Sequence, residues 1–258
     1  SRRATSTWRE ICKFKMIRTF QIFYEGKTYP LQYPFSPLME SIVTQIMTKN
    51  EYPLLPFLQN HSGAVLDIGA NIGCASLLFS VYYPLATIYA FEPSPSSFQF
   101  LQSNMKQFPN VHPFNYGLDS KDGSARLYSG QGASVTNSLG TSVLNSSEFE
   151  TAELRRLSAF ILDNDLDRIL LIKIDTEGSE VPILKDIEHL LDRVESVMLE
   201  YHSEGDRLEI DRLLTNRFML YSGNAPNPHR GTLIYVSKST VAAKTNWDAI
   251  AIHRPFQF

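Results

Sequence analysis

Hydrophobic runs and amphipathic stretches alternate along the middle of this chain, from about residue 63 to residue 215. The short apolar runs predict strands near residues 63–68, 86–92, 111–117, 169–175 and 194–201. Apolar residues at helical spacing predict helices near residues 72–82, 95–107, 179–192 and 206–215. Strands that alternate with helices are typical of a parallel sheet with right-handed crossovers, so the pattern predicts an α/β fold.

The chain before residue 50 follows a different pattern. Two alternating stretches, 19–24 and 27–32, flank Glu25-Gly26 and predict a β-hairpin. A helix is predicted from Pro37, with these apolar residues on one face: Leu38, Ile42, Val43, Ile46 and Met47. We therefore expect residues 1–50 to form an N-terminal extension and residues 51–258 to form one larger domain.

Residues 1–18 carry six basic side chains against one acid, Glu10, with apolar residues interleaved. Such a segment suits a targeting or membrane-surface sequence, and a basic helix or linker that docks on the domain explains it as well. A chain that begins with Ser rather than Met also suggests a processed protein or an excised piece of a longer one.

Small polar residues dominate Ser129 to Ser147, with no period typical of a helix or strand. A loop this long in a compact domain is usually functional or disordered, so both an active-site lid and a passive surface loop fit. Its neighbours, 125–128 and 154–158, look like short strands that would place the loop over the carboxyl edge of the sheet. Gly231 to Ser237 is predicted as an extra strand or part of a hairpin.

The run Val65-Leu66-Asp67-Ile68-Gly69-Ala70-Asn71-Ile72-Gly73 predicts a buried strand, a glycine turn and the start of a helix. Such turns bind cofactors in doubly wound sheets, because glycine allows the backbone to approach a ligand closely. The dinucleotide pattern G-x-G-x-x-G needs glycines at 71 and 74, where this chain has Asn71 and Cys74, which disfavours an NAD-dependent oxidoreductase. Asp67 before the turn suits a positively charged ligand such as S-adenosylmethionine (SAM).

A second acidic residue, Glu92, ends the strand near 86–92 and precedes Pro93. Glu92 follows Gly69 by 23 residues, close to the interval at which a carboxylate after the second strand reaches ribose hydroxyls. The predicted cofactor-binding residues of these two strands are Asp67, Gly69, Ala70, Asn71, Gly73, Glu92 and Pro93.

A third strand delivers Asp175 and Glu177 to the same edge, and a helix that starts near Glu180 follows it. With DIGANIG at 67–73, FEPSP at 91–95 and KIDTEGSE at 173–180, the chain resembles the FkbM family of SAM-dependent methyltransferases over roughly residues 50–253. The resemblance implies a Rossmann-like, seven-stranded class I methyltransferase sheet of order 3-2-1-4-5-7-6, with the last strand antiparallel. It assigns residues 248–253 to that last strand. In characterised members it implies transfer to hydroxyl groups of sugars and secondary metabolites.

In methyltransferases, a polar side chain after the third strand commonly contacts the adenine amino group. The candidates here are Asn115 and Asp119, on either side of Gly117, although Asp119 to Gly123 is also a good turn sequence. All three residues are predicted to lie at the cofactor, together with Asp175.

Methyl transfer is a direct displacement at the sulfonium, so the protein must align a nucleophile and remove its proton. The candidate catalytic residues are Asp175, His202, Glu177 and Lys173. His202 is a candidate base with an unperturbed pKa near 6.5, although an ordinary hydrogen-bonded histidine also fits. Lys173 would lower the pKa of Asp175, which favours an orienting role for that carboxylate over proton transfer. Asp175 with Glu177 could instead hold a divalent cation, but two carboxylates are a weak metal signal.

Composition places limits on the partners. The 258 residues are 43% hydrophobic and carry a formal net charge of −3, which suits one enzyme domain and argues against nucleic acid as a substrate. Two cysteines and no apolar run that could span a bilayer predict a cytoplasmic protein without a transmembrane segment.

The sequence therefore predicts a SAM-dependent O-methyltransferase of secondary metabolism. We expect its acceptor to be a hydroxyl of a sugar, polyketide or peptide-derived small molecule. No Asn-Pro-Pro-Tyr-like segment follows the strand that ends at Asp175, which lowers the odds of transfer to a base amine. The alternative is a non-catalytic, methyltransferase-like binding or scaffold domain. Either protein would suit a larger synthase or a homo-oligomer.

Overall fold

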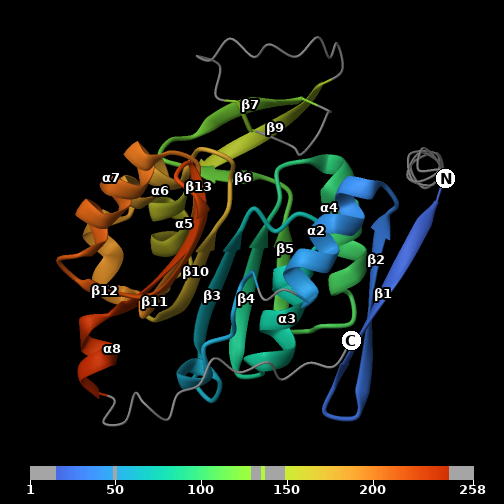
Figure 1. The fold of residues 1–258 in the computed structure, drawn as a ribbon, viewed down its shortest axis with the longest axis horizontal. Helices are drawn as coiled ribbons and strands as arrows, with labels where there is room; N and C mark the ends of the chain where they lie inside the picture. The colour runs from blue at the N-terminus through green and yellow to red at the C-terminus, as the bar shows by residue number, and fades with distance from the viewer. Residues whose placement is uncertain (1–15, 49–50, 129–134, 137–148, 244–258) are drawn as a thin grey trace.

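A seven-stranded mixed sheet forms the centre of the protein in the computed structural model, which describes residues 16–48, 51–128, 135–136 and 149–243 (Figure 1). Its strands are β3 (Gly63–Ile68), β4 (Ala86–Phe91), β5 (Val111–Phe114), β10 (Ile169–Ile174), β11 (Ser196–Tyr201), β12 (Phe218–Asn227) and β13 (Arg230–Ser237). Their order in the sheet is β12-β13-β11-β10-β3-β4-β5. The strands from β11 to β5 are parallel, and β13 is antiparallel to both of its neighbours.

This order confirms the predicted class I methyltransferase sheet. The antiparallel strand is β13 rather than residues 248–253, which lie outside the residues that the structure describes. Gly231 to Ser237 belongs to β13 and forms a hairpin with β12. Residues 231–237 therefore form the antiparallel strand of the sheet, which the family resemblance had assigned to residues 248–253.

Helices cover both faces of the sheet (Figure 1). One face packs against α3 (Cys74–Tyr82) and α4 (Pro95–Met105), and the other against α5 (Leu157–Asp163), α6 (Glu180–Asp186) and α7 (Glu204–Leu214). Side chains alternate along each strand, so Val65 joins the first hydrophobic cluster and Leu66 joins the second. Because both faces are buried, these strands read as continuous apolar runs, which is why they could be located from the sequence.

The N-terminal extension contains β1 (Ile17–Tyr24), β2 (Lys27–Pro34) and α2 (Pro37–Thr48), followed by the short helix η1 (Pro56–Leu58). The predicted hairpin is confirmed, with positive φ angles of 48° at Glu25 and 76° at Gly26 that suit a two-residue turn. Val43 and Met47 of α2 share one hydrophobic cluster with α3. The boundary near residue 50 stays a prediction, and residues 1–15 of the basic segment lie outside the described residues.

A smaller sheet lies beyond the carboxyl ends of the central strands (Figure 1). It contains β6 (Gly117–Asp119), β7 (Gly123–Tyr128), β8 (Val135–Thr136) and β9 (Phe149–Arg156). The Ser94 hydroxyl at the start of α4 donates to Glu150 of β9 at 2.6 Å and ties this sheet to the central domain. Apart from β8, the predicted lid from Ser129 to Ser147 lies outside the described residues.

Three element boundaries differ from the prediction. The strand predicted for 111–117 is divided, because the pairing of β5 with β4 ends at Phe114 and Gly117 starts β6 in the other sheet. The stretch 154–158 ends as strand at Arg156, and α5 begins at Leu157. The helix predicted for 179–192 becomes α6 and the 3₁₀ helix η2 (Glu188–Arg193), because Ile187 leaves the α-helical conformation with φ −100° and ψ 7°.

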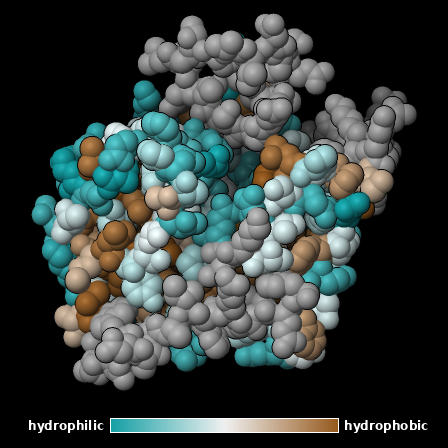
Figure 2. Space-filling model, in the orientation of Figure 1, coloured by the Kyte–Doolittle hydropathy of each residue, from teal (hydrophilic) through white to brown (hydrophobic). Residues whose placement is uncertain are grey.

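Hydrophilic side chains gather over α6 and α7 on the face shown in Figure 2. Exposed ion pairs follow α7, where Arg207 pairs with Glu204 and Asp211 at 2.8 and 2.9 Å. The helix α8 (Lys238–Ala243) follows β13 directly. In the part of the chain that the structure describes, no helix has the length and apolar character needed to cross a membrane.

Candidate active site

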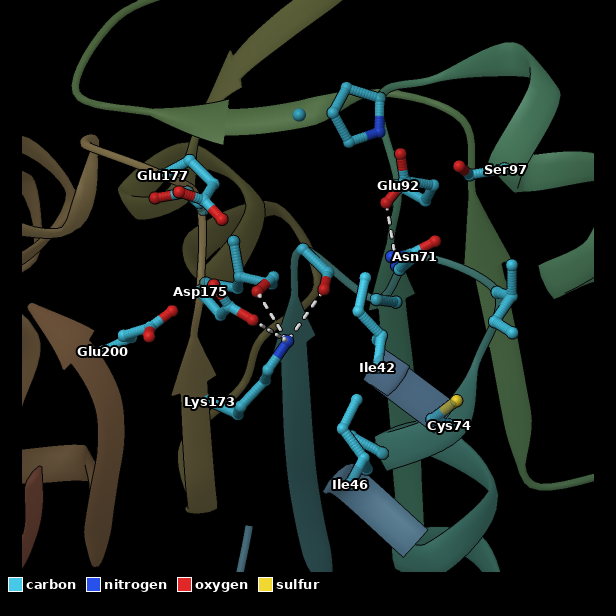
Figure 3. Close-up of a pocket in the computed structure, with 18 of the residues that line it drawn as sticks. Ile42, Ile46, Asn71, Cys74, Glu92, Ser97, Lys173, Asp175, Glu177 and Glu200 are labelled. Carbon is cyan, nitrogen blue, oxygen red and sulfur yellow. Dashed lines mark hydrogen bonds and ion pairs between the residues drawn. The ribbon is translucent and has the colours of Figure 1, made fainter. Parts of the chain in front are cut away.

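A pocket opens at the carboxyl edge of the central sheet (Figure 3). The ends of β3, β4, β10 and β11 supply its floor, and α2 with the segment after it supplies one wall. Most of the residues predicted for cofactor and catalysis line it, namely Gly69, Ala70, Asn71, Glu92, Pro93, Gly117, Lys173, Asp175 and Glu177. Five predicted residues are not among the described residues that line it, namely Asp67, Gly73, Asn115, Asp119 and His202.

Gly69 is required by the contact between two strands. Its φ is 78°, and a Cβ atom at this position would lie 1.8 Å from the backbone oxygen of Asp175. The sequence predicted that the backbone at Gly69 would approach a ligand closely. In the structure, the backbone that lies against Gly69 is that of Asp175, directly after β10. Gly73, with φ 95°, faces Met105 of α4 instead of the pocket, because a Cβ atom there would lie 2.9 Å from the Met105 methyl carbon.

Beneath the turn, Lys173 and Asp67 form a buried ion pair at 3.2 Å. The Asp67 side chain is fully buried and also accepts a hydrogen bond from the Ser76 hydroxyl at 2.5 Å. The Lys173 ammonium donates to the Gly69 carbonyl at 2.7 Å. Burial opposes the positive charge, but Asp67 and Asp175 outweigh it and raise the pKa of Lys173. Asp67 therefore holds the turn and β10 together and is removed from direct contact with a ligand.

Glu92 holds the opposite side of the turn. Its two carboxylate oxygens accept hydrogen bonds at 2.8 Å from the backbone N–H groups of Asn71 and Ser94. Burial raises the pKa of Glu92 to about 7, although these N–H groups act against the rise. Each carboxylate oxygen can accept a further hydrogen bond, and the side chain lines the pocket, so it can bind a ligand's hydroxyl groups.

Beyond Glu92 the pocket wall becomes apolar, with Pro93, Gly117, Leu118, Leu127 and Leu154. The Asn115 side-chain amide donates to the Glu92 backbone carbonyl at 2.9 Å and so orients the end of the strand. Asn115 itself does not line the pocket. Asp119 is buried and accepts from the backbone N–H of Ser120. Neither of the two predicted adenine contacts lines the pocket, so their role stays a prediction, and the apolar wall offers another surface for a base.

At the end of β10, the Tyr52 hydroxyl donates to Asp175 at 2.5 Å, and the Lys173 ammonium lies 3.8 Å from the same carboxylate oxygen. Burial alone would raise the pKa of Asp175, but Lys173 and Tyr52 reverse the effect and lower it. Burial also raises the pKa of Tyr52 well above its ordinary value, so the phenol stays protonated and donates. The geometry agrees with an orienting role for Asp175.

His202 lies among carboxylates beside this strand end. Its ring nitrogens are 3.7 Å from Glu177, 3.6 Å from Glu180 and 3.9 Å from Glu200. These acids, with Glu180 first, raise the pKa of His202 to about 9 against the effect of burial. The imidazole is therefore protonated at neutral pH. The prediction that His202 acts as a base, made from its unperturbed pKa, does not fit this environment.

Glu180 organises the turn that carries Glu177. Its carboxylate accepts hydrogen bonds from the backbone N–H groups of Thr176 and Gly178, both at 2.9 Å. Glu177 itself adopts a positive φ of 57°, which is uncommon for a residue other than glycine. The turn thus projects Glu177 into the pocket from a backbone that Glu180 holds in place.

Two further pocket residues, Glu200 and Arg230, were missed as site residues by the sequence reasoning. Glu200 is the penultimate residue of β11, its side chain is 7% exposed, and both of its oxygens pair with the Arg230 guanidinium. Burial raises the pKa of Glu200 to about 7 although Arg230 lowers it. The place of Glu200 at the end of a strand could be predicted from the sequence, because it lies in the run Glu200-Tyr201-His202. Arg230 reaches the pocket from β13, and no sequence motif identifies it as a site residue.

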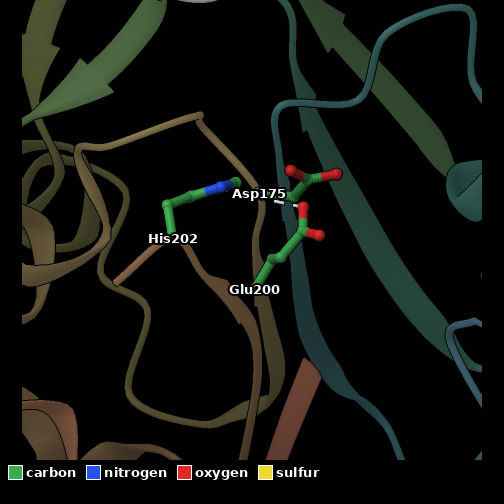
Figure 4. A group of neighbouring side chains, drawn as sticks. All are labelled: Asp175, Glu200 and His202. Atoms are coloured by element: carbon green, nitrogen blue, oxygen red, sulfur yellow. Dashed lines mark ion pairs between the residues drawn. The ribbon is translucent and has the colours of Figure 1, made fainter. Parts of the chain in front are cut away.

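Among the described residues, one group has the geometry for a metal ion, because Asp175, Glu200 and His202 offer ligand atoms within 4.8 Å of one another (Figure 4). The predicted pair of Asp175 and Glu177 is not this group. Two of its members already face positive charge, since Glu200 pairs with Arg230 and Asp175 lies beside Lys173. A protonated His202 cannot donate a lone pair to a metal. Metal binding would therefore have to displace a proton and compete with these cations.

Comparison with known proteins gives matches over most of the chain. The family model described as the methyltransferase FkbM domain matches residues 67–221. The chain is 30% identical to Methyltransferase 1 of Beauveria bassiana over 202 residues, 69% of this chain and 80% of that protein. It is 28% identical to the hexuronic acid methyltransferase AglP of Haloferax volcanii over 150 residues, 58% of this chain and 60% of that protein. It is 22% identical to the 2-O-methyltransferase NoeI of Sinorhizobium fredii over 165 residues, 58% of this chain and 68% of that protein.

Proposed function

The chain belongs to the FkbM family of SAM-dependent methyltransferases, and from this premise we propose that it methylates a hydroxyl oxygen of a sugar, polyketide or peptide-derived small molecule. The observation that carries the proposal is the set of carboxylates at the β10 and β11 ends, where Asp175 can orient a hydroxyl and Glu200 can accept its proton. Among the relatives, the one named a hexuronic acid methyltransferase supports a sugar-like acceptor, and the one named a 2-O-methyltransferase supports transfer to oxygen.

The two ends of the pocket suggest how SAM lies in it. The apolar wall beyond Glu92 suits the adenine, Glu92 suits the ribose hydroxyls, and the charged end near Lys173 and Asp175 suits the amino acid portion. The cofactor supplies an electrophilic methyl group. The acceptor hydroxyl must then approach from the side of Glu177, Glu200 and Arg230.

Turnover with labelled cofactor tests the proposal. We expect the protein, incubated with SAM labelled at the methyl group and a panel of glycosides, uronic acids and polyketide alcohols, to release S-adenosylhomocysteine and label one acceptor class. Mass spectrometry of the product would locate the label on oxygen. Label on nitrogen or carbon would contradict the O-methyltransferase assignment, and tight cofactor binding without any transfer would favour a binding or scaffold domain.

Replacing Glu92 with glutamine is expected to weaken S-adenosylhomocysteine binding about 10- to 100-fold, because charge-assisted hydrogen bonds worth roughly 1.5–3 kcal/mol are lost. Calorimetry measures the affinity, and the exposed Glu153→Gln serves as a matched control. Because burial raises the pKa of Glu92 to about 7, wild-type binding should also strengthen as the pH rises through this value. An unchanged affinity in a folded Glu92→Gln protein would remove Glu92 from the ribose site.

Chelation is expected to leave the transfer rate unchanged, because Lys173 and Arg230 already lie beside two of the three residues with metal-binding geometry and the third, His202, is protonated. The measurement is the initial rate after dialysis against EDTA, with and without added magnesium. A rate that falls on chelation and returns with magnesium would show metal catalysis at this group.

A further inference from the structure

The wall of the pocket formed by α2 and the residues after it lies outside the segment that the family model matches. Ile42, Gln45, Ile46, Glu51 and Tyr52 line the pocket and all precede residue 67. Ile42 and Ile46 are one helical turn apart and lie at the pocket in Figure 3, while Val43 and Met47 are buried in the core. The N-terminal extension therefore completes the site.

Nearly every carboxylate that lines the pocket already has a partner within the protein. Glu92 accepts from two backbone N–H groups, Asp175 accepts from Tyr52 and faces Lys173, and Arg230 lies at Glu177 and Glu200. The exception is Glu51, which forms no hydrogen bond or ion pair with the residues that the structure describes. Its carboxylate is thus available to a ligand.

The surroundings of Glu51 favour a cationic ligand group. Burial raises the pKa of Glu51, and the negative charge of Asp175 adds to the rise, while Lys173 and Arg230 oppose it. A partly desolvated carboxylate beside a second one gains most from a new positive charge with N–H donors. The charges that act on Glu51 also place it at the polar end of the pocket, opposite the apolar wall beyond Glu92.

We propose that Glu51 binds the α-ammonium group of the SAM methionine portion, so that the segment after α2, which precedes the family-model match, supplies part of the cofactor site. This inference rests on the proposed function. Asp67, the acid that the sequence offered for this charge, is fully buried in its pair with Lys173 and cannot take the role. Tyr52, the next residue after Glu51, donates a hydrogen bond to Asp175 at the end of β10. With Glu51 at the ammonium group, the same short segment would contact both the cofactor and Asp175.

The test compares two ligands that differ in the amino acid portion. S-Adenosylhomocysteine carries the ammonium group, and 5′-methylthioadenosine keeps the adenosine and the thioether without it. For Glu51→Gln we expect calorimetry to give about 10- to 100-fold weaker binding of S-adenosylhomocysteine, as for the loss of one charge-assisted hydrogen bond, and unchanged binding of 5′-methylthioadenosine. The exposed Glu188→Gln is the matched control and should bind both ligands like the wild type.

Each other outcome overturns a defined statement. Unchanged binding of S-adenosylhomocysteine by Glu51→Gln removes Glu51 from the cofactor site. Equal weakening of both ligands assigns Glu51 a structural role, and thermal unfolding of the variant checks whether the fold has changed. Failure of the wild-type protein to bind S-adenosylhomocysteine would overturn the proposed function itself, and the inference with it.

Discussion

Replacing Lys173 with methionine is expected to lower the free energy of unfolding by about 3–5 kcal/mol, the range for removing one partner of a buried ion pair. The Lys173 side chain is 2% exposed and lies 3.2 Å from Asp67, which is fully buried. Methionine fills a similar volume but leaves Asp67 without a counter-charge and the Gly69 carbonyl without its donor. Denaturant unfolding followed by circular dichroism measures the effect.

Lys185→Met is the matched control. Lys185 pairs with Glu209 at 2.8 Å, but its side chain is 52% exposed, so the pair is screened by water and contributes about 0–1 kcal/mol. Adding Asp67→Asn to Lys173→Met should recover part of the loss, because it removes the uncompensated charge. Equal effects of Lys173→Met and Lys185→Met would show that the buried pair does not hold the turn against β10.

The sheet and the cofactor turn could be predicted because their signals are local. Strands buried on both faces appear as apolar runs, and the interval between Gly69 and Glu92 follows from one strand-helix-strand unit of ordinary length. The division of residues 111–117 between two sheets could not be predicted in this way. The division depends on which strands pair with each part, since residues 111–114 pair with β4 and residues 117–119 pair with β9. The sequence of the segment itself does not contain this information.

The protonation states of the site residues were harder to predict than the places of these residues in the fold. Lys173 was expected to act on Asp175, because residues two apart on a strand share a face, and the structure places them 3.8 Å apart. His202 was given its unperturbed pKa, since nothing in the sequence indicated that Glu177, Glu180 and Glu200 would surround it. Glu177 lies in a turn with a positive φ, Glu180 begins α6, and Glu200 lies on β11 two positions before His202.

Some residues reach the site from elements outside the motifs, and no sequence interval could predict that they would do so. Tyr52 lies 123 positions before Asp175 and Arg230 lies 30 positions after Glu200, yet both contact these carboxylates. Their role depends on the packing of the N-terminal extension and of the β12–β13 hairpin. Sequence reasoning therefore located Asp175, Glu177 and the Lys173 that acts on Asp175, and it missed Glu200 and the partners Tyr52 and Arg230 that come from other elements.

Replacing Glu200 with glutamine is expected to lower the turnover number by a factor on the order of 10²–10⁴, the usual effect of losing a general base. Glu200 lines the pocket, and its pKa of about 7 is matched to proton transfer near neutrality. Asp175 is held ionised by Lys173 and is a weaker base, and His202 is already protonated. Binding of S-adenosylhomocysteine should change little, because the loss occurs in the transfer step.

The pH dependence of the rate, measured with the acceptor found by label transfer, identifies the base. In the wild type the rate should rise with pH through about 7, because Glu200 must lose its proton before it can accept one. In Glu200→Gln this rise should disappear. In Arg230→Gln it should move to higher pH, since removing the guanidinium removes a charge that lowers the pKa of Glu200. A wild-type rate in Glu200→Gln, together with a large loss in His202→Gln or Asp175→Asn, would transfer the role to that residue.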